Sequence, residues 1–412
     1  MTVPRSPGRW TIALAGAIAL AIAMGIGRFA FTPLLPMMLH DGVIDLHGAS
    51  WLASANYLGY LGGALLCTFQ PWIWARVPGL PAIKPSALLR GGLVATALLT
   101  MGMAVPVAAA WPLWRFAAGI ASAVVFVYTS GWCLTRLASM NQASLGAAIY
   151  TGPGIGIVIS GVFATGMVQW GWTAQAGWVI FGLLAAGLAA AVWRVFRGEA
   201  SAQVPVAAPT APAAAGGASG APRHGGVEIA FLAFGYGLAG FGYIVTATFL
   251  PVIARQALPG SPWLDLFWPV FGLGVMIGPL IATRLPTTLD QRALLAVCHV
   301  VQAIGIVIGI WSPSLAGFAL GSLLLGIPFT AITFFAIQEI RRLRPLQAAS
   351  FMGLITVLYG LGQIAGPPMV ALVLRHSATT GAGFTLALEI AAGGLLLGAA
   401  TYLVMLPLWP TR

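Results

Sequence analysis

Three charged side chains stand inside long apolar stretches of this sequence, and their chemistry has to be explained first. They are Arg28, Arg115 and Glu389. An arginine near the centre of a lipid bilayer costs about 2.5 to 3.5 kcal/mol on insertion scales, so such a residue usually faces a cavity or a partner. The two arginines are therefore candidates for binding a ligand, and Glu389 is a candidate for carrying a proton.

Arg28 is the one charge in the stretch AMGIGRFAFTPLLPMM (23–38). A planar guanidinium can hold a carboxylate or a phosphate through two hydrogen bonds, which would make Arg28 an anion clamp. The alternative is that Arg28 bonds to helix carbonyls loosened near Pro33 and Pro36, because proline has no backbone N–H to offer them. Both interpretations stay open at this point.

The composition predicts an integral membrane protein. Of the 412 residues, 59% are hydrophobic and only 7% are charged, whereas an ordinary soluble domain carries about 25% charged residues. Apolar runs long enough to cross a hydrocarbon core of about 30 Å as helices recur along the chain. Twelve such runs are expected, at about 10–38, 50–72, 87–108, 111–135, 143–168, 174–196, 228–254, 263–285, 291–311, 314–338, 348–374 and 383–408.

The net charge of +11 has a strongly uneven distribution. With the N-terminus placed inside, fifteen of the 19 Lys and Arg residues fall on the cytoplasmic side. The outer side receives Arg255 and Arg375 together with Asp41, Asp45 and Asp265. This asymmetry follows the positive-inside rule and places both termini in the cytoplasm of a bacterial-type inner membrane. The basic balance thus orients the chain in its bilayer, and no nucleic-acid partner is expected.

A segment at 198–226 interrupts the apolar pattern. It has no aromatic residue and is composed largely of Ala, Pro and Gly, so it cannot support a core. We expect a disordered cytoplasmic linker there, joining an N-terminal six-helix bundle (1–197) to a C-terminal one (227–412).

The two halves repeat each other. Gly25, Gly27, Leu35 and Pro36 return 215 positions later as Gly240, Gly242, Leu250 and Pro251. Further on, RLASMNQAS (136–144) returns as RLRPLQAAS (342–350) at an offset of 206. Two halves of six helices with the same topology form a parallel repeat. Within this frame the charge is not duplicated, because Tyr243 stands opposite Arg28.

Several motifs resemble those of the major facilitator superfamily (MFS). RFAAGIASA (115–123) is similar to its helix 4 motif, and GPGIG (152–156) to the helix 5 signature associated with exporters and antiporters. GIGRFAFTPLLPMM (25–38), NYLGYLGG (56–63) and YGLGQIAGP (359–367) resemble the YbfB/YjiJ-like branch. One departure is the segment between the second and third spans, which lacks the acid that the superfamily usually has there.

The resemblance implies an all-α MFS fold with twelve transmembrane helices in two pseudo-symmetric bundles. It also implies that helices 1, 4, 7 and 10 line a central cavity and that helix 12 is peripheral. The predicted substrate-binding residues are Arg28, Tyr57, Arg115, Tyr243, Tyr359 and Gln363, and the predicted coupling or gating residues are Asp41, Glu389, Gly152 and Pro153.

For several of these residues a structural role is the alternative. Arg115 could reach the membrane surface, and Glu389 could be a buried partner of a neighbouring hydroxyl or of His299. The tyrosines and Gln363 could tie helices together.

No nucleotide-binding, metal-binding or nucleophile motif is present in the sequence, so no enzyme activity, cofactor or metal is expected. The leading expectation is a monomeric secondary transporter that moves a small organic solute, anionic because two arginines and no acid are expected in the cavity. A proton or a counter-substrate could be coupled to it. The alternatives are a proton-coupled exporter of amphipathic compounds, a transport-inactive receptor or scaffold, and an integral membrane enzyme.

Overall fold

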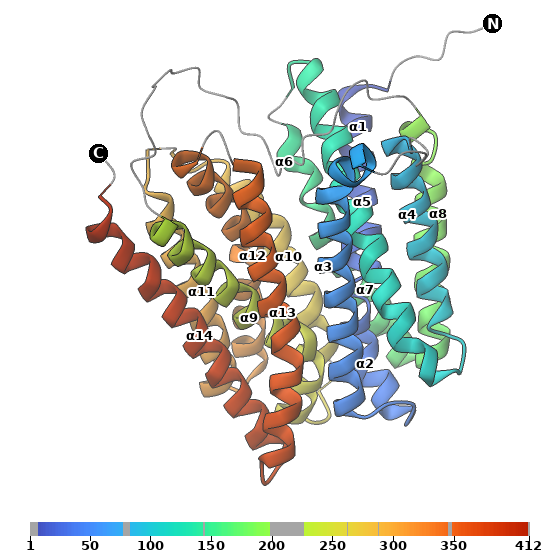
Figure 1. Ribbon diagram of the computed structural model, residues 1–412. Helices are drawn as coiled ribbons and strands as arrows, with labels where there is room; N and C mark the ends of the chain where they lie inside the picture. Colours follow the sequence, from blue (N-terminus) through green and yellow to red (C-terminus); the bar gives the residue numbers. More distant parts are fainter. Residues whose placement is uncertain are drawn as a thin grey trace, which may run out of the picture.

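In the computed structural model the chain forms two helical bundles that stand side by side (Figure 1). The structure describes residues 7–76, 83–142, 145–197, 226–261, 263–286, 288–344 and 348–410. The predicted linker at 198–226 therefore lies outside the described residues, except for its last position. Helix α1 begins and helix α14 ends at the same end of the molecule, which we call the terminal face, and the opposite end is the far face (Figure 1).

The predicted fold of two six-helix bundles is confirmed, and each of the twelve predicted spans has a helical counterpart. Ten of the described helical stretches are long and apolar enough to cross a membrane, and α3 and α4 correspond to the other two predicted spans. The N-terminal bundle comprises α1 (Arg9–Leu20), the π-helix η1 (Ala21–Ile26), α2 (Phe31–His40), α3 (Leu46–Arg76), α4 (Pro85–Gly102), α5 (Trp111–Ser139), α6 (Gly146–Ile149), α7 (Gly152–Gln169) and α8 (Ala174–Val192).

The C-terminal bundle repeats this arrangement with straighter elements. It comprises α9 (Gly226–Ala257), α10 (Phe267–Ala282), α11 (Gln291–Trp311), α12 (Leu315–Leu343), α13 (Ala348–His376) and α14 (Thr380–Leu408). Large apolar side chains are exposed along the outer helices of both bundles, as expected of surfaces that contact lipid tails.

The first predicted span is not one continuous helix. Helix α1 passes into the six-residue π-helix η1, a turn follows at 27–30, and α2 then begins at Phe31. The glycines lower helix propensity, and Pro33 offers no N–H to the carbonyl four residues before it. The span predicted at about 10–38 is confirmed as Arg9–His40, but apolar length alone does not predict the break within it.

Two helix pairs join the bundles along their length, α3 with α13 and α7 with α10. Helix α7 also crosses η1 at a very short distance, because a Cβ atom on Gly25 would lie 2.3 Å from the Cα of Gly156. Only glycine permits this approach of two backbones. The glycines of the GPGIG motif thus hold α7 between the broken first span and the C-terminal bundle.

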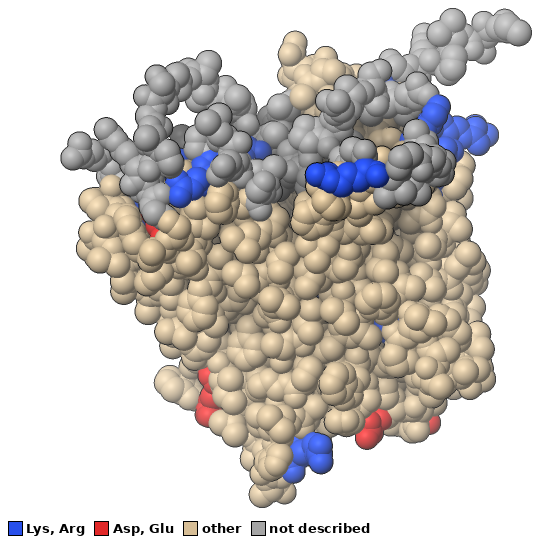
Figure 2. Space-filling model, viewed as in Figure 1, with Lys and Arg blue, Asp and Glu red and all other residues tan. Residues whose placement is uncertain are grey.

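The charges divide between the two ends of the molecule. Lys and Arg gather along the edge of the terminal face, while only a few charged groups of either sign mark the far face (Figure 2). On the far face Arg255 pairs with Asp265 at 2.6 Å. Between the two edges the visible surface carries almost no charge, which is the distribution that a bilayer requires.

Candidate solute site between the two bundles

Arg28 lies in the turn between η1 and α2 and reaches across to the C-terminal bundle. Its side chain is 3% exposed, and its Nη2 donates a hydrogen bond of 2.5 Å to Oε1 of Gln363 in α13. Gln363 in turn donates through Nε2 to the hydroxyl of Tyr243 in α9. One polar chain therefore connects the first span of the N-terminal bundle to two helices of the other bundle.

Aromatic rings surround this polar chain. The guanidinium carbon of Arg28 lies 4.3 Å from the ring centroid of Tyr60 and 5.1 Å from that of Tyr57. On the other side, Tyr243 stacks on Tyr359 with centroids 5.9 Å apart and planes inclined by 19°. Rings at these distances attract a cation through their faces and offer flat apolar surface to the carbon skeleton of a ligand.

The charge of Arg28 has no ionic partner among the described residues. Its Nε is buried without a hydrogen bond, and within the described part of the chain no carboxylate lies within 4 Å of its guanidinium. A buried ion is costly unless it is paired and hydrogen-bonded. On the edge of the guanidinium formed by Nε and Nη2, only Nη2 has an acceptor, the neutral amide oxygen of Gln363. A carboxylate or phosphate could accept from both nitrogens and would also balance the charge.

The site lies on the pseudo-twofold axis of the molecule. Thr32 donates through Oγ1 to the carbonyl of Ala247 at 2.9 Å, and these two residues are 215 positions apart, the offset of the sequence repeat. Equivalent residues can touch only where the axis passes between them. The same offset relates Arg28 to Tyr243, so the two ends of the polar chain are equivalent positions with different chemistry.

Contacts between the bundles close the site on its far-face side. Helix α2 runs from the turn toward the far face, so Thr32 lies beyond Arg28 in that direction. The hydroxyls of Tyr57 and Thr248 meet at 3.0 Å, and Ser54 donates to a carbonyl of α13. A ligand leaving toward the far face would require these hydrogen bonds to break.

Arg115 makes different contacts from those of Arg28. It lies in α5, is 2% exposed, and donates from Nη1 to the carbonyl of Gly27 at 3.3 Å and from Nη2 to the carbonyl of Arg28 at 3.2 Å. These carbonyls belong to the turn, where the regular helix ladder is interrupted. Bonding to loosened helix carbonyls was the structural alternative for Arg28, but the structure shows this role for Arg115. Arg115 thus stabilises the turn from which the side chain of Arg28 extends.

Two of the predicted coupling residues lie outside this site. Asp41 accepts a hydrogen bond of 2.7 Å from the backbone N–H of Ala174 and so caps the start of α8 on the far face. Glu389 lies on an exposed part of α14, at the periphery. His299, considered as its partner, is instead within hydrogen-bond distance of the carbonyls of Leu295 and Gly235.

Gly152 and Pro153 begin α7 beside the first span. A Cβ on Gly152 would lie 2.2 Å from the carbonyl oxygen of Ala17, and Pro153 occupies the first turn of the helix, where a missing N–H costs nothing. Both residues lie at the crossing of α7 with α1, and no hydrogen bond within the described residues joins them to the side chains of the polar chain.

The sequence model of the family described as uncharacterised MFS-type transporter YbfB matches residues 20–403. The chain belongs to the major facilitator superfamily. The family and the fold make it an integral, multi-pass membrane protein of a transporter class rather than an enzyme class.

Solved MFS structures share its fold at low sequence identity. A mutant of the nucleoside transporter NupG is 13% identical, with a TM-score of 0.70 over 96% of this chain and 99% of that one. A D-xylose-proton symporter is 11% identical, with a TM-score of 0.71 over 95% of this chain and 97% of that one. No curated protein matches this chain by sequence.

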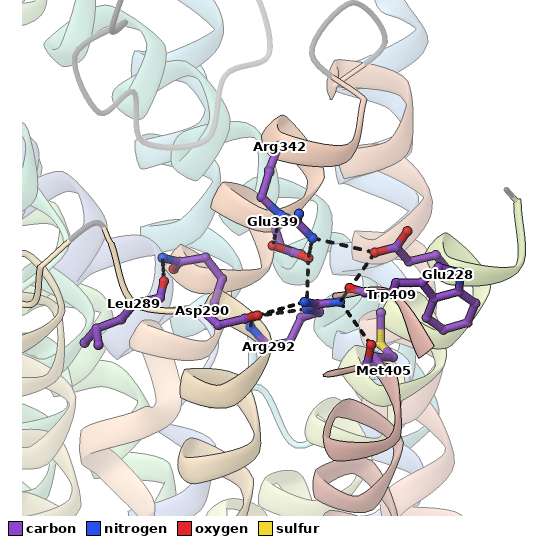
Figure 3. Close-up of polar contacts among 9 residues, drawn as sticks. Glu228, Leu289, Asp290, Arg292, Glu339, Arg342, Met405 and Trp409 are labelled. Carbon is purple, nitrogen blue, oxygen red and sulfur yellow. Dashed lines mark hydrogen bonds and ion pairs between the residues drawn. The ribbon is translucent and has the colours of Figure 1, made fainter. Parts of the chain in front are cut away.

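This MFS chain also holds a buried charge cluster that the sequence analysis missed, at the terminal-face end of the C-terminal bundle (Figure 3). It consists of Glu228, Asp290, Arg292, Glu339 and Arg342. Arg292 is fully buried and makes a two-point contact with Asp290, at 3.0 and 2.7 Å. It lies 3.7 Å from Glu228 and 3.6 Å from Glu339, and Arg342 binds both oxygens of Glu339.

The cluster fastens four helices to one another. Besides its acidic partners in α9 and α12, Arg292 of α11 donates to the carbonyls of Met405 and Trp409 at the end of α14. The sequence signal for this cluster was the pair Glu339 and Arg342, three residues apart on one helix face. The cluster was not predicted because these charges were assigned to a loop. At the repeat offset of 215, Asp290 corresponds to Ala75, so the acid missing from the first half is present in the second.

Tyr60, Thr32 and Thr248 are the site residues that the sequence analysis did not select. Tyr60 follows Tyr57 by three residues on α3, a spacing that places both rings on one helix face. Thr32 follows Arg28 by one helical turn. A search for polar and aromatic neighbours at helical spacing around the selected residues would have found Tyr60 and Thr32.

Proposed function

We propose that this MFS protein is a secondary transporter that carries a small organic anion by alternating access. The observation that carries the proposal is the state of Arg28, a buried guanidinium between the bundles that has an amide oxygen and aromatic rings as neighbours but no described carboxylate. Such a site is short of one negative charge. A carboxylate or phosphate of the solute would supply it.

The polar chain suggests how binding would be linked to movement. In the observed state, Gln363 occupies the Nη2 donor of Arg28 and at the same time bridges to the other bundle. An anion that takes the Nε and Nη2 donors would displace the amide oxygen of Gln363. The cross-bundle link would then run through the solute, with Tyr243 and the Nε2 group of Gln363 as further donors.

The rings on either side suggest the shape of the solute. Tyr57 and Tyr60 lie at the guanidinium, while Tyr243 and Tyr359 stack beyond Gln363. A charged end at Arg28 followed by a short, flat or apolar body would contact both pairs. The NupG and D-xylose structures are similar in fold only, and we take no substrate from them.

We further propose that the terminal face is cytoplasmic in a bacterial-type inner membrane. The support is the gathering of Lys and Arg on that face (Figure 2). The segment 198–226 would then link the two bundles, 1–197 and 227–412, on the cytoplasmic side, and the protein would act as a monomer. In this orientation the observed closure lies on the outer side of the site.

A thermal-shift screen would test the anion site on the purified protein. The probes are small mono- and dicarboxylates and organic phosphates, each beside its neutral amide or alcohol analogue. A ligand that binds only the folded state raises the melting temperature, so we expect stabilisation by one class of anion and none by its neutral analogues. Arg28→Gln should abolish the shift, while Arg284→Gln, on the exposed terminal face, should keep it. Equal shifts from neutral analogues would contradict an anion site.

Flux in proteoliposomes would then test transport and its coupling. Using the stabilising anion, wild-type protein should exchange labelled solute, Arg28→Ala should not, and Arg28→Lys should be weaker because a lysine cannot present a two-point donor edge. Transport that survives Arg28→Ala unchanged would refute the proposal. A dependence of the flux on an imposed proton gradient would show proton coupling, whereas dependence on an internal solute alone would show exchange.

A further inference from the structure

An apolar groove of about 350 Å³ runs down the outside of the N-terminal bundle between α4 and α8. These helices lie at the edge of the molecule away from the C-terminal bundle (Figure 1), so the groove opens toward the lipid and not toward the solute site. Its volume is within the range of about 300 to 1,000 Å³ that is usual for small-molecule sites. One wall includes Val94 and Leu98 of α4, and the other includes Ala189 and Ala190 of α8.

The groove forms because α8 has Gly182 in its middle and small alanines toward the terminal face. The helices are closest toward the far face, where a Cβ on Gly182 would lie 2.0 Å from Cγ of Met101. Toward the terminal face, α8 offers Ala186, Ala189 and Ala190, whose methyl groups do not fill the space beside α4. The groove thus lies mainly on the terminal-face side of this close crossing.

Basic side chains line the terminal-face end of the groove. Arg194 and Arg197 follow the end of α8 and are exposed. Within the described part of the chain neither guanidinium has a hydrogen bond or an ion pair. Nearby, the guanidinium carbon of Arg90 in α4 lies 5.1 Å from the ring centroid of Trp193, which places a third positive charge beside the same end.

The groove fits within one leaflet. From Val94 to Met101, the α4 residues that line it rise by about 10 Å at about 1.5 Å per residue, and half of a hydrocarbon core is about 15 Å thick. The unpaired guanidinium groups therefore lie at the level of lipid headgroups, and the apolar walls lie beside the acyl chains.

We propose that this groove binds an anionic phospholipid from the leaflet on the terminal face, with one acyl chain between α4 and α8 and the phosphate at Arg194 and Arg197. The charge of the groove and its depth both select this occupant. Guanidinium groups bind phosphate through parallel hydrogen bonds, and basic pockets between transmembrane helices are suited to acidic headgroups. A zwitterionic lipid would fill the apolar walls equally well but would gain less at the arginines.

Native mass spectrometry of the full chain tests the proposal with an equimolar mixture of phosphatidylglycerol and phosphatidylcholine. We expect retained lipid to be mainly phosphatidylglycerol. Each arginine near a membrane surface contributes about a five-fold preference for acidic lipid, so Arg194→Gln should reduce the ratio about five-fold and the double variant with Arg197→Gln should nearly abolish it. Arg284→Gln, an equal loss of charge at the terminal face of the other bundle, should leave the ratio unchanged.

A second pair of variants tests the place of binding without changing charge. Ala190→Phe would fill the groove, whereas Ala191→Phe adds the same ring at an exposed neighbouring position that does not line it. We expect only Ala190→Phe to lose the retained phosphatidylglycerol. Equal retention of the two lipids by wild-type protein, an unchanged ratio in the double arginine variant, or full retention by Ala190→Phe would each overturn the proposal.

Discussion

At the scale of single residues, the two buried arginines make different kinds of contact, although both stand in similar apolar sequence. Arg115 donates from its Nη groups to carbonyls of its own bundle, while Arg28 donates from Nη2 to Gln363 of the other bundle. The turn at 27–30 connects them, because the backbone that Arg115 holds is the backbone from which Arg28 extends. The residue that we propose to bind the solute and the residue that holds its backbone are therefore neighbours in space.

Replacement of Arg115 should lower stability without removing the anion-binding group. Arg115→Leu leaves the carbonyls of Gly27 and Arg28 without their charged donors, and hydrogen bonds to charged groups contribute about 1.5 to 3 kcal/mol each. We expect a clearly lower melting temperature together with an anion-induced shift that persists at saturating anion. Thermal unfolding with and without anion measures both. Loss of the shift with an unchanged melting temperature would assign Arg115 to binding instead.

At the scale of helices, glycines decide how closely two elements can pack. A Cβ on Gly154 of α7 would lie 2.5 Å from Cγ of Met276 and 2.6 Å from the carbonyl oxygen of Gly272, both in α10 of the other bundle. Small residues let two helices approach closely, and this crossing has no room for an added side chain. The C-terminal bundle is fastened differently, by the charge cluster around Arg292.

Gly154→Ala should impair transport by obstructing this contact. The added methyl group has to displace α10, and overpacking of this kind costs about 1 to 3 kcal/mol. We expect reduced solute exchange in proteoliposomes. Gly166→Ala on the same helix is the matched control, because its nearest neighbour would be a tryptophan ring carbon 4.0 Å away. Equal exchange rates in the two variants would show that the crossing tolerates a side chain.

Arg292→Met should destabilise the C-terminal bundle strongly. It leaves Glu228 and Glu339 buried without this cation, and removal of one partner from a buried ion pair costs about 3 to 5 kcal/mol. Thermal unfolding should show this loss. Adding Glu228→Gln and Glu339→Gln should restore part of it by removing the excess of buried negative charge. A melting temperature unchanged by Arg292→Met would mean that the cluster is not what holds the four helices.

At the scale of the whole molecule, most of the architecture follows from the sequence. Apolar run length and the repeat offset of 215 predict the spans and the two bundles, because a bilayer permits few alternatives to a helix. The repeat also predicts that Arg28 faces Tyr243. Gln363 could be selected as a candidate, yet its position between them depends on how α13 packs. The cluster around Arg292 could not be placed either, since its members come from three separate stretches of the chain that meet only in the folded bundle.

A disulfide across the axis would test alternating access. Thr32 and Ala247 are in hydrogen-bond contact, and the three native cysteines are buried and unpaired. We expect the double variant Thr32→Cys, Ala247→Cys to crosslink on oxidation and to lose solute exchange, which a reductant should restore. Each single variant should exchange normally. Unimpaired exchange by the crosslinked protein would mean that the far-face closure does not open during transport.

The π-helix η1 has a consequence for the register of the first span. In a regular helix each residue turns the chain by about 100°, so the wider turn of a π-helix changes the direction in which every later side chain points. Arg28 follows residues 21–26 by two positions, so the direction of its side chain depends on how this stretch is wound. We expect deletion of one alanine from the stretch to change that direction and to remove the hydrogen bond from Arg28 to Gln363. The number of residues before Arg28, and not their identity alone, thus determines where the side chain of Arg28 lies.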